Sequence, residues 1–125
     1  MKVVTDASPL NYLVLIDAEH VLPKFFGEVL VPREVIDELG HPRTPTKVRE
    51  WVSARPTWLH VKSPSSALPK EKLGPGESAA IAIALDTSAD ALLIDERDGT
   101  AAAQRLGIKT IGTLIGSNAG FSGRS

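Results

Sequence analysis

Acidic residues follow two short apolar segments of this chain, at the points where predicted strands end. Asp6 comes directly after the segment 2–5, and Asp95 comes directly after the segment 91–94. Short apolar runs that alternate with helical segments are typical of a parallel sheet covered on both faces, whose ligands lie beyond the carboxyl ends of the strands. We therefore expect the two aspartates to lie close together at one edge of a sheet.

Three further carboxylates occur in helical segments that can bring them to the same edge. Glu77 opens "GESAAIAIAL", Asp98 lies three residues after Asp95, and Glu38 lies near the end of "PREVIDELG". Two like charges 4 Å apart cost about 4 kcal/mol at an effective dielectric constant of 20, and a small domain has a total stability of roughly 5–15 kcal/mol. A cluster of this kind must take up protons, recruit Lys or Arg, or bind a cation.

A hard divalent cation suits this set of donors. The chain has no Cys, and its three His lie in different segments without the spacing of metal ligands, which leaves oxygen donors. Carboxylate oxygens bind Mg²⁺ or Mn²⁺ well, and these ions promote the hydrolysis of phosphodiester bonds. A converging acidic cluster would therefore predict a metal-dependent hydrolytic site.

Each carboxylate also has a purely structural interpretation. Asp98 before "GTA" suits an N-cap, Glu77 in a first helical turn complements the helix dipole, and Asp6 suits a cap for the helix that follows it. Glu38 has the pattern of a solvated helix residue. Asp95 is the hardest to explain in structural terms, because a turn can begin with many other residues.

The predicted fold class is α/β, with a three-layer α/β/α arrangement around a parallel central sheet. Ser8 and Pro9 are expected to open the first helix, as N-cap and first helical residue. A loop rich in Pro, Ser and Gly is expected over 63–76. Glu34 and Asp37 are interpreted as exposed charges. Strands are expected at 2–5, 28–31, 58–61, 91–94 and 108–112.

Length and composition indicate one domain over 1–116 and a polar tail, expected to be disordered, over 117–125. The chain has 125 residues and a net charge of −1, whereas a domain that binds nucleic acid by overall charge alone is clearly basic. A local basic patch fits within a neutral total. No leader and no apolar run near the ~20 residues of a membrane span is evident. A cytoplasmic protein without a membrane partner is expected.

In four stretches the chain resembles the PIN-domain family, and within it small prokaryotic PIN-like proteins related to VapC-type toxin ribonucleases. The stretches are "VVTDASPLNYLVLI", "FGEVLVPREVIDEL", "LGPGESAAIAIALD" and "ADALLIDERDGTAAAQRLGIKTIGTLIG". Together, and in this order, they cover most of residues 3–116. The resemblance implies a parallel sheet flanked by helices, with an acidic pocket that binds Mg²⁺ or Mn²⁺ and cleaves RNA.

The resemblance also implies partners and residue roles. An RNA substrate, a small antitoxin protein and a homodimer are expected, because many relatives are toxins that pair with an antitoxin and dimerise. Ser8 matches the small hydroxyl residue of the family and is expected to support the site. Asp6, Glu38, Glu77 and Asp95 match as catalytic residues. The predicted metal ligands are Asp6, Glu77, Asp95 and Asp98, and the substrate-binding candidates, left unranked, are Lys24, Arg33, Arg43, Lys47 and Arg97.

Two departures from the family pattern keep an alternative open. Glu77 stands where many PIN domains have Asp, and Gly/Ser-rich sequence follows the last strand where relatives carry a further helical segment. With the lack of net basic charge, this favours a catalytically degenerate PIN-like module that binds nucleic acid or protein. A phosphotransfer receiver is a weaker alternative, because Lys109 lies at the start of a predicted strand and not at its end.

Overall fold

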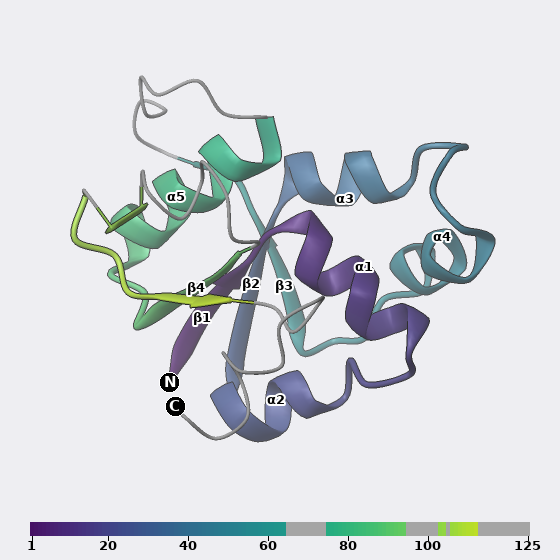
Figure 1. Ribbon diagram of the computed structural model, residues 1–125, viewed down its shortest axis with the longest axis horizontal. Coiled ribbons are helices and arrows are strands. Elements are labelled where there is room, and N and C mark those ends of the chain that lie inside the picture. Colours follow the sequence, from purple (N-terminus) through teal and green to yellow (C-terminus); the bar gives the residue numbers. More distant parts are fainter. Residues whose placement is uncertain (65–74, 95–102, 105, 113–125) are drawn as a thin grey trace.

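The computed structural model describes residues 1–64, 75–94, 103–104 and 106–112. Helices and strands alternate along much of these residues (Figure 1). In chain order the elements are β1 (Lys2–Thr5), α1 (Ala7–Leu15), α2 (Val21–Phe26), β2 (Glu28–Pro32), α3 (Arg33–Leu39), α4 (Thr46–Ser53), β3 (Leu59–Lys62), α5 (Pro75–Thr87), β4 (Ala91–Ile94) and β5 (Thr110–Gly112).

The strands form one parallel sheet in the order β3-β2-β1-β4-β5. From β1 the chain adds β2 and then β3 on one side, and then crosses over through α5 to place β4 on the other side of β1. The strand order therefore reverses between β1 and β4, and ligands of open parallel sheets bind at such a switch point, beyond the carboxyl ends of the strands.

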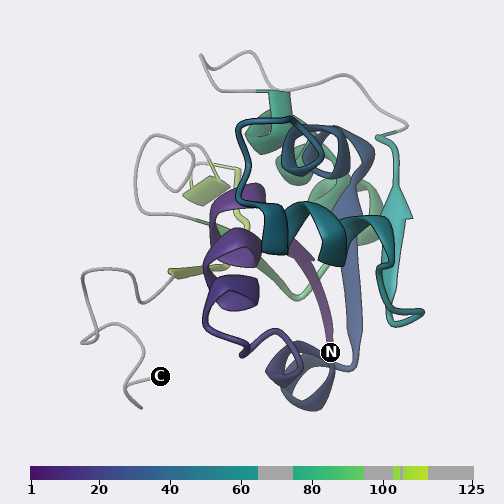
Figure 2. The ribbon, with the colours of Figure 1, turned by 90° about the vertical axis from the view of Figure 1, so that its right-hand side faces the viewer.

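Alternate residues of the strands face two separate cores, which confirms the predicted three-layer arrangement. On one face Val3, Val29 and Leu93 pack with the buried residues of α1, α3 and α4. On the other face Val4 and Leu92 pack with the buried residues of α5. Because side chains of a strand alternate between faces, a short all-apolar strand is what a sheet covered on both sides requires. Figures 1 and 2 show α5 and α1 on opposite sides of the sheet.

Helix α5 is the most deeply buried helix near the switch point. Its six consecutive residues from Ala79 to Ala84 are each at most 3% exposed, and it packs against α3, β1, β2 and β4. A helix that is apolar on all sides is stable only when it is surrounded, and the small Ala side chains let its backbone lie close to the sheet. The first turn of α5 is therefore held firmly. No helix of the described residues is long and apolar enough to cross a membrane.

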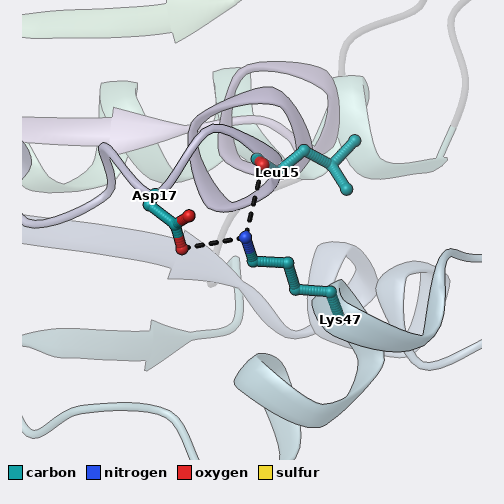
Figure 3. A network of polar contacts seen from close by, with 3 residues as sticks. All are labelled: Leu15, Asp17 and Lys47. Atoms are coloured by element: carbon teal, nitrogen blue, oxygen red, sulfur yellow. Dashed lines mark hydrogen bonds and ion pairs between the residues drawn. The ribbon is translucent and has the colours of Figure 1, made fainter.

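The end of α1 is attached to α4 by a small polar network (Figure 3). The Lys47 ammonium group lies 2.8 Å from a carboxylate oxygen of Asp17 and donates to the Leu15 carbonyl oxygen over 3.4 Å. Asp17 adopts a positive φ of 58°, which Asp tolerates better than most residues. All of these groups are exposed, so the ion pair contributes about 0–1 kcal/mol and serves mainly to fix how α1 ends.

The structure corrects the predicted start of the first helix. The helix begins at Ala7, so Asp6 takes the N-cap position and Ser8 is an exposed residue of the first turn. The Asp6 N–H donates to the Leu93 carbonyl oxygen over 2.9 Å, which continues the pairing of β1 with β4 beyond β1 and keeps Asp6 extended. Strand pairing thus displaced the local capping preference of Ser8. The Asp6 side chain makes no capping hydrogen bond.

Other boundaries also differ from those expected. Helix α5 begins at Pro75, so Pro75 and Gly76 belong to a helix and not to the predicted loop; Pro is well suited to a first helical position. The short helix α2 was not expected. Strand β3 lies one residue later than predicted, and β5 is confined to Thr110–Gly112. The predicted tail lies outside the described residues.

A pair of leucines in α1 tests how much the inner face of this helix contributes to stability. Leu10 is fully buried, whereas Leu15 is 41% exposed. We expect Leu10→Ala to lower the free energy of unfolding by about 2–5 kcal/mol, because it leaves a cavity in the core. Leu15→Ala should change it by about 0.5 kcal/mol or less. Urea unfolding followed by circular dichroism measures both, and equal losses would contradict this orientation of α1.

Candidate active site

A cavity of about 590 Å³ lies at the carboxyl ends of the central strands. The start of α1, one face of α3 and the first turn of α5 contribute its walls. Nine described residues line it, and five of these are acidic. The lining residues are Asp6, Ala7, Ser8, Glu34, Asp37, Glu38, Pro75, Gly76 and Glu77.

Asp6 lines this cavity as a buried residue that is 4% exposed. Its backbone is fixed by the hydrogen bond to Leu93, one residue before the end of β4. The position of the Asp6 side chain is therefore set by the sheet. The residue that follows β4 in sequence is Asp95, and both Asp95 and Asp98 lie outside the described residues, as does Arg97.

Gly76 shows how close the carboxylates of Asp6 and Glu38 come to each other. A Cβ atom at Gly76 would lie 3.1 Å from Glu38 Oε1 and 3.3 Å from Asp6 Oδ1. The two oxygens are therefore no more than 6.4 Å apart, the sum of these distances. The third neighbour of this point is Val35 Cγ2 at 3.2 Å. The missing side chain of Gly76 thus leaves a small space between two carboxylates from different elements.

Repulsion between carboxylates is evident at Glu38. Partial burial raises the pKa of the Glu38 carboxyl above its usual value, and the negative charge of Glu77 raises this pKa further. The side chain of Glu38 remains largely exposed at the mouth of the cavity, and Glu77 is half-buried. Of the predicted site residues, Asp6, Ser8, Glu38 and Glu77 are thus brought to one cavity.

Glu34 and Asp37 also line the cavity. Glu34 is half-buried, which corrects its interpretation as an exposed charge, whereas Asp37 is exposed as predicted. Glu34 Oε1 is buried, and among the described residues it has no hydrogen-bond partner. The sequence did contain a signal for them. Asp37 and Glu38 follow Glu34 by three and four residues, so each of them lies next to Glu34 on the helix surface.

The chemistry of this lining fits a hard cation, but the described residues do not form a complete metal site. Of the described lining residues none is Lys, Arg, His or Cys, so the donors are carboxylate and hydroxyl oxygens. Gly76, which has no side chain, lets the carboxylates of Asp6 and Glu38 approach its backbone closely. Within the described ranges, however, no three His, Asp or Glu side chains lie close enough together to hold a metal ion.

An open parallel sheet with an acidic cavity at its switch point defines an α/β protein that places its ligands at the carboxyl ends of the strands. The sequence model of the PIN-domain family matches residues 2–115. The chain therefore belongs to the PIN-domain family, as its sequence motifs predicted. The curated protein sequences contain no match to the chain.

The same fold occurs in a solved archaeal structure. The chain is similar to a PilT N-terminus domain protein, SSO1118, from the hyperthermophilic archaeon Sulfolobus solfataricus P2, with a TM-score of 0.65 and 14% sequence identity. The similarity covers 100% of this chain and 98% of the archaeal chain. At this identity it establishes the fold alone. The PIN domain places the chain in a nuclease superfamily whose members act on nucleic acid and typically use divalent metals.

Replacing Gly76 tests whether the space between the two carboxylates matters for cation binding. In Gly76→Ala the new Cβ would crowd Glu38 and Asp6, and Val35 is fully buried and has no room to retreat. We expect Mn²⁺ affinity in isothermal titration to fall several-fold. Stability should change by about 1 kcal/mol or less, because Ala also has the higher helix propensity. Gly40→Ala is the control, because its nearest contact would be an ordinary 3.5 Å; equal Mn²⁺ affinities of the two variants would contradict this role.

The raised pKa of Glu38 predicts a pH-dependent effect on stability. Between the ordinary value of 4.5 and the raised pKa, the folded chain holds a proton that the unfolded chain has lost, so stability falls as pH rises through this window. In buffer with EDTA, Glu38→Gln should therefore be more stable than the parent at neutral pH, and the difference should vanish below about pH 4.5. Thermal melts across pH 4–8 measure this. The matched control is Glu50→Gln, on α4 outside the cavity lining.

Proposed function

We propose that this protein is a ribonuclease that depends on Mg²⁺ or Mn²⁺ and hydrolyses phosphodiester bonds of RNA. The observation that carries the proposal is the placement of the Asp6 and Glu38 carboxylates close together beside Gly76, within a PIN fold. A cavity with five acidic residues repels the phosphates of a nucleic acid unless a cation is present. Metal-dependent cleavage reconciles this lining with the nuclease superfamily.

Asp6, Glu77, Asp95 and Asp98 are proposed to hold the metal, with Glu38 beside them. When bound, a divalent ion in such a site lowers the pKa of water and stabilises negative charge on the phosphoryl oxygens. The buried, backbone-fixed Asp6 provides an oxygen in a set position.

Glu38 and Ser8 have supporting roles in this proposal. Glu38 lines the same cavity on α3 and is proposed to support the metal ligands from there. The exposed Ser8 hydroxyl, in the first turn of α1, is available to donate to a substrate oxygen. The resemblance to toxin ribonucleases extends the proposal to a cytoplasmic homodimer whose activity a small antitoxin inhibits.

One observation favours a second candidate, a PIN-like module that binds nucleic acid or protein without cleaving it. No three potential ligands of the described residues lie within reach of one metal ion. Isothermal titration with Mn²⁺ separates the two candidates: the enzyme binds the ion and loses this binding in Asp95→Asn, whereas the module binds little in either form.

Conservative amide variants test the proposed activity directly. In a fluorogenic RNA assay with Mn²⁺, we expect Asp6→Asn and Asp95→Asn each to lower cleavage at least about 100-fold, because each removes a charged oxygen donor from the metal. Glu28→Gln, at the exposed amino end of β2, should cleave like the parent. If both aspartate variants cut RNA as fast as the parent, the assignment is wrong. Melting curves in EDTA check that these variants remain folded.

A further inference from the structure

Two basic side chains lie at the same sheet edge as the acidic cavity. In the parallel register of β2 and β3, Pro32 is paired with Lys62, and Arg33 directly follows Pro32 at the start of α3. Figure 2 shows the arrowheads of these two neighbouring strands at one end of the sheet, with α2 at the other end. Arg33 and Lys62 are both exposed, and Glu34, the next residue after Arg33, lines the cavity.

Arg33 and Lys62 are also available for an external ligand. Within the described part of the chain, neither side chain makes an ion pair or a hydrogen bond. Several other basic side chains have partners. Lys47 contacts Asp17 and the Leu15 carbonyl, and the others donate to backbone carbonyls as follows: Lys2 to Thr87, Arg49 to Thr44 and Arg55 to Val52.

The geometry points to Arg33 and Lys62 as a phosphate-binding flank that guides the backbone of single-stranded RNA across the ends of β2 and β3 to the acidic cavity. This inference rests on the proposed function, because it names how the substrate of that cavity is held. Five carboxylates repel a polyanion at the cavity itself, so the substrate must gain its electrostatic attraction beside it. Contacts to phosphates fix the position and direction of a nucleic acid without reading its sequence.

The chemistry of the two side chains suits different parts of this task. The planar guanidinium group of Arg33 can donate two parallel hydrogen bonds to one phosphate, which fixes orientation. The ammonium group of Lys62 is a point charge on a flexible side chain, so it can stay close to an RNA phosphate as the RNA backbone moves. With a net charge of −1 for the whole chain, the attraction is local and depends on a few cations. Removing two of them should therefore have a large relative effect.

RNA binding tests the flank. The probe is a fluorescein-labelled single-stranded RNA of mixed sequence, and its anisotropy is measured in EDTA over a series of salt concentrations. For Arg33→Gln with Lys62→Gln, the slope of log affinity against log salt should fall by about 0.7 per lost phosphate contact, and affinity at 0.1 M salt by about fivefold per contact. The matched control is Lys109→Gln, an exposed Lys directly before β5 and therefore at the amino-terminal edge of the parallel sheet, which should bind like the parent. Arg33→Lys with Lys62→Arg should keep most of the affinity.

The outcomes separate this inference from the proposed function. The flank is overturned if the double variant keeps the affinity and the salt slope of the parent. It is also overturned if only Arg43→Gln, in the loop between α3 and α4, loses binding. A parent that binds no RNA would overturn it as well. If the double variant loses binding while the parent fails to cleave RNA with Mn²⁺, the flank stands and the nuclease proposal fails. If the parent cleaves and the double variant cleaves equally well at limiting RNA, the nuclease stands and the flank fails.

Discussion

Mutual repulsion of carboxylates in one cavity is the constraint that shapes this fold. Partial burial raises the pKa of the Glu38 carboxyl, and the negative charge of Glu77 raises it further. Each acidic group is held by its backbone, which limits how far repulsion can spread the carboxylates. Asp6 is tied to Leu93 of β4, and the helix of Glu38 is anchored by buried Val35, among other residues. The favourable free energy of packing the two cores therefore offsets the electrostatic repulsion between the carboxylates of the cavity.

The first turn of α5 shows how backbone and site are matched. Gly in a helix costs up to about 1 kcal/mol relative to Ala, and α5 is otherwise rich in Ala. Gly76 is the position at which a Cβ would meet Glu38, Val35 and Asp6 within 3.3 Å. The glycine is thus explained by the space between two carboxylates, and helix propensity alone would disfavour it. The cost remains tolerable because the buried residues that follow hold α5 in place.

The sequence predicted features that depend on neighbouring residues or on strand polarity, and missed those that depend on packing between elements. Apolar runs specified the parallel sheet, and strand ends located Asp6. The capping preference of Ser8 was overridden because Asp6 still pairs with β4. A solvated helix pattern cannot reveal that the face with Glu34 meets α5 across a cavity, and Gly76 suggested a loop because Pro and Gly usually end helices. The predicted roles of Asp95 and Asp98 stay predictions.

The net charge of −1 is compatible with a nucleic-acid partner because the charges of the chain are separated in space. The acidic groups gather in the cavity, whereas Arg33 and Lys62 stand at the exposed ends of β2 and β3 beside it. Opposite charges separated in this way produce local electrostatic fields, which the net charge of the chain does not reveal. Because the flank contains only a few cations, its RNA affinity should fall less steeply with salt concentration than that of a basic domain. Such a surface attracts a polyanion weakly, and a cation that neutralises the cavity would strengthen this binding.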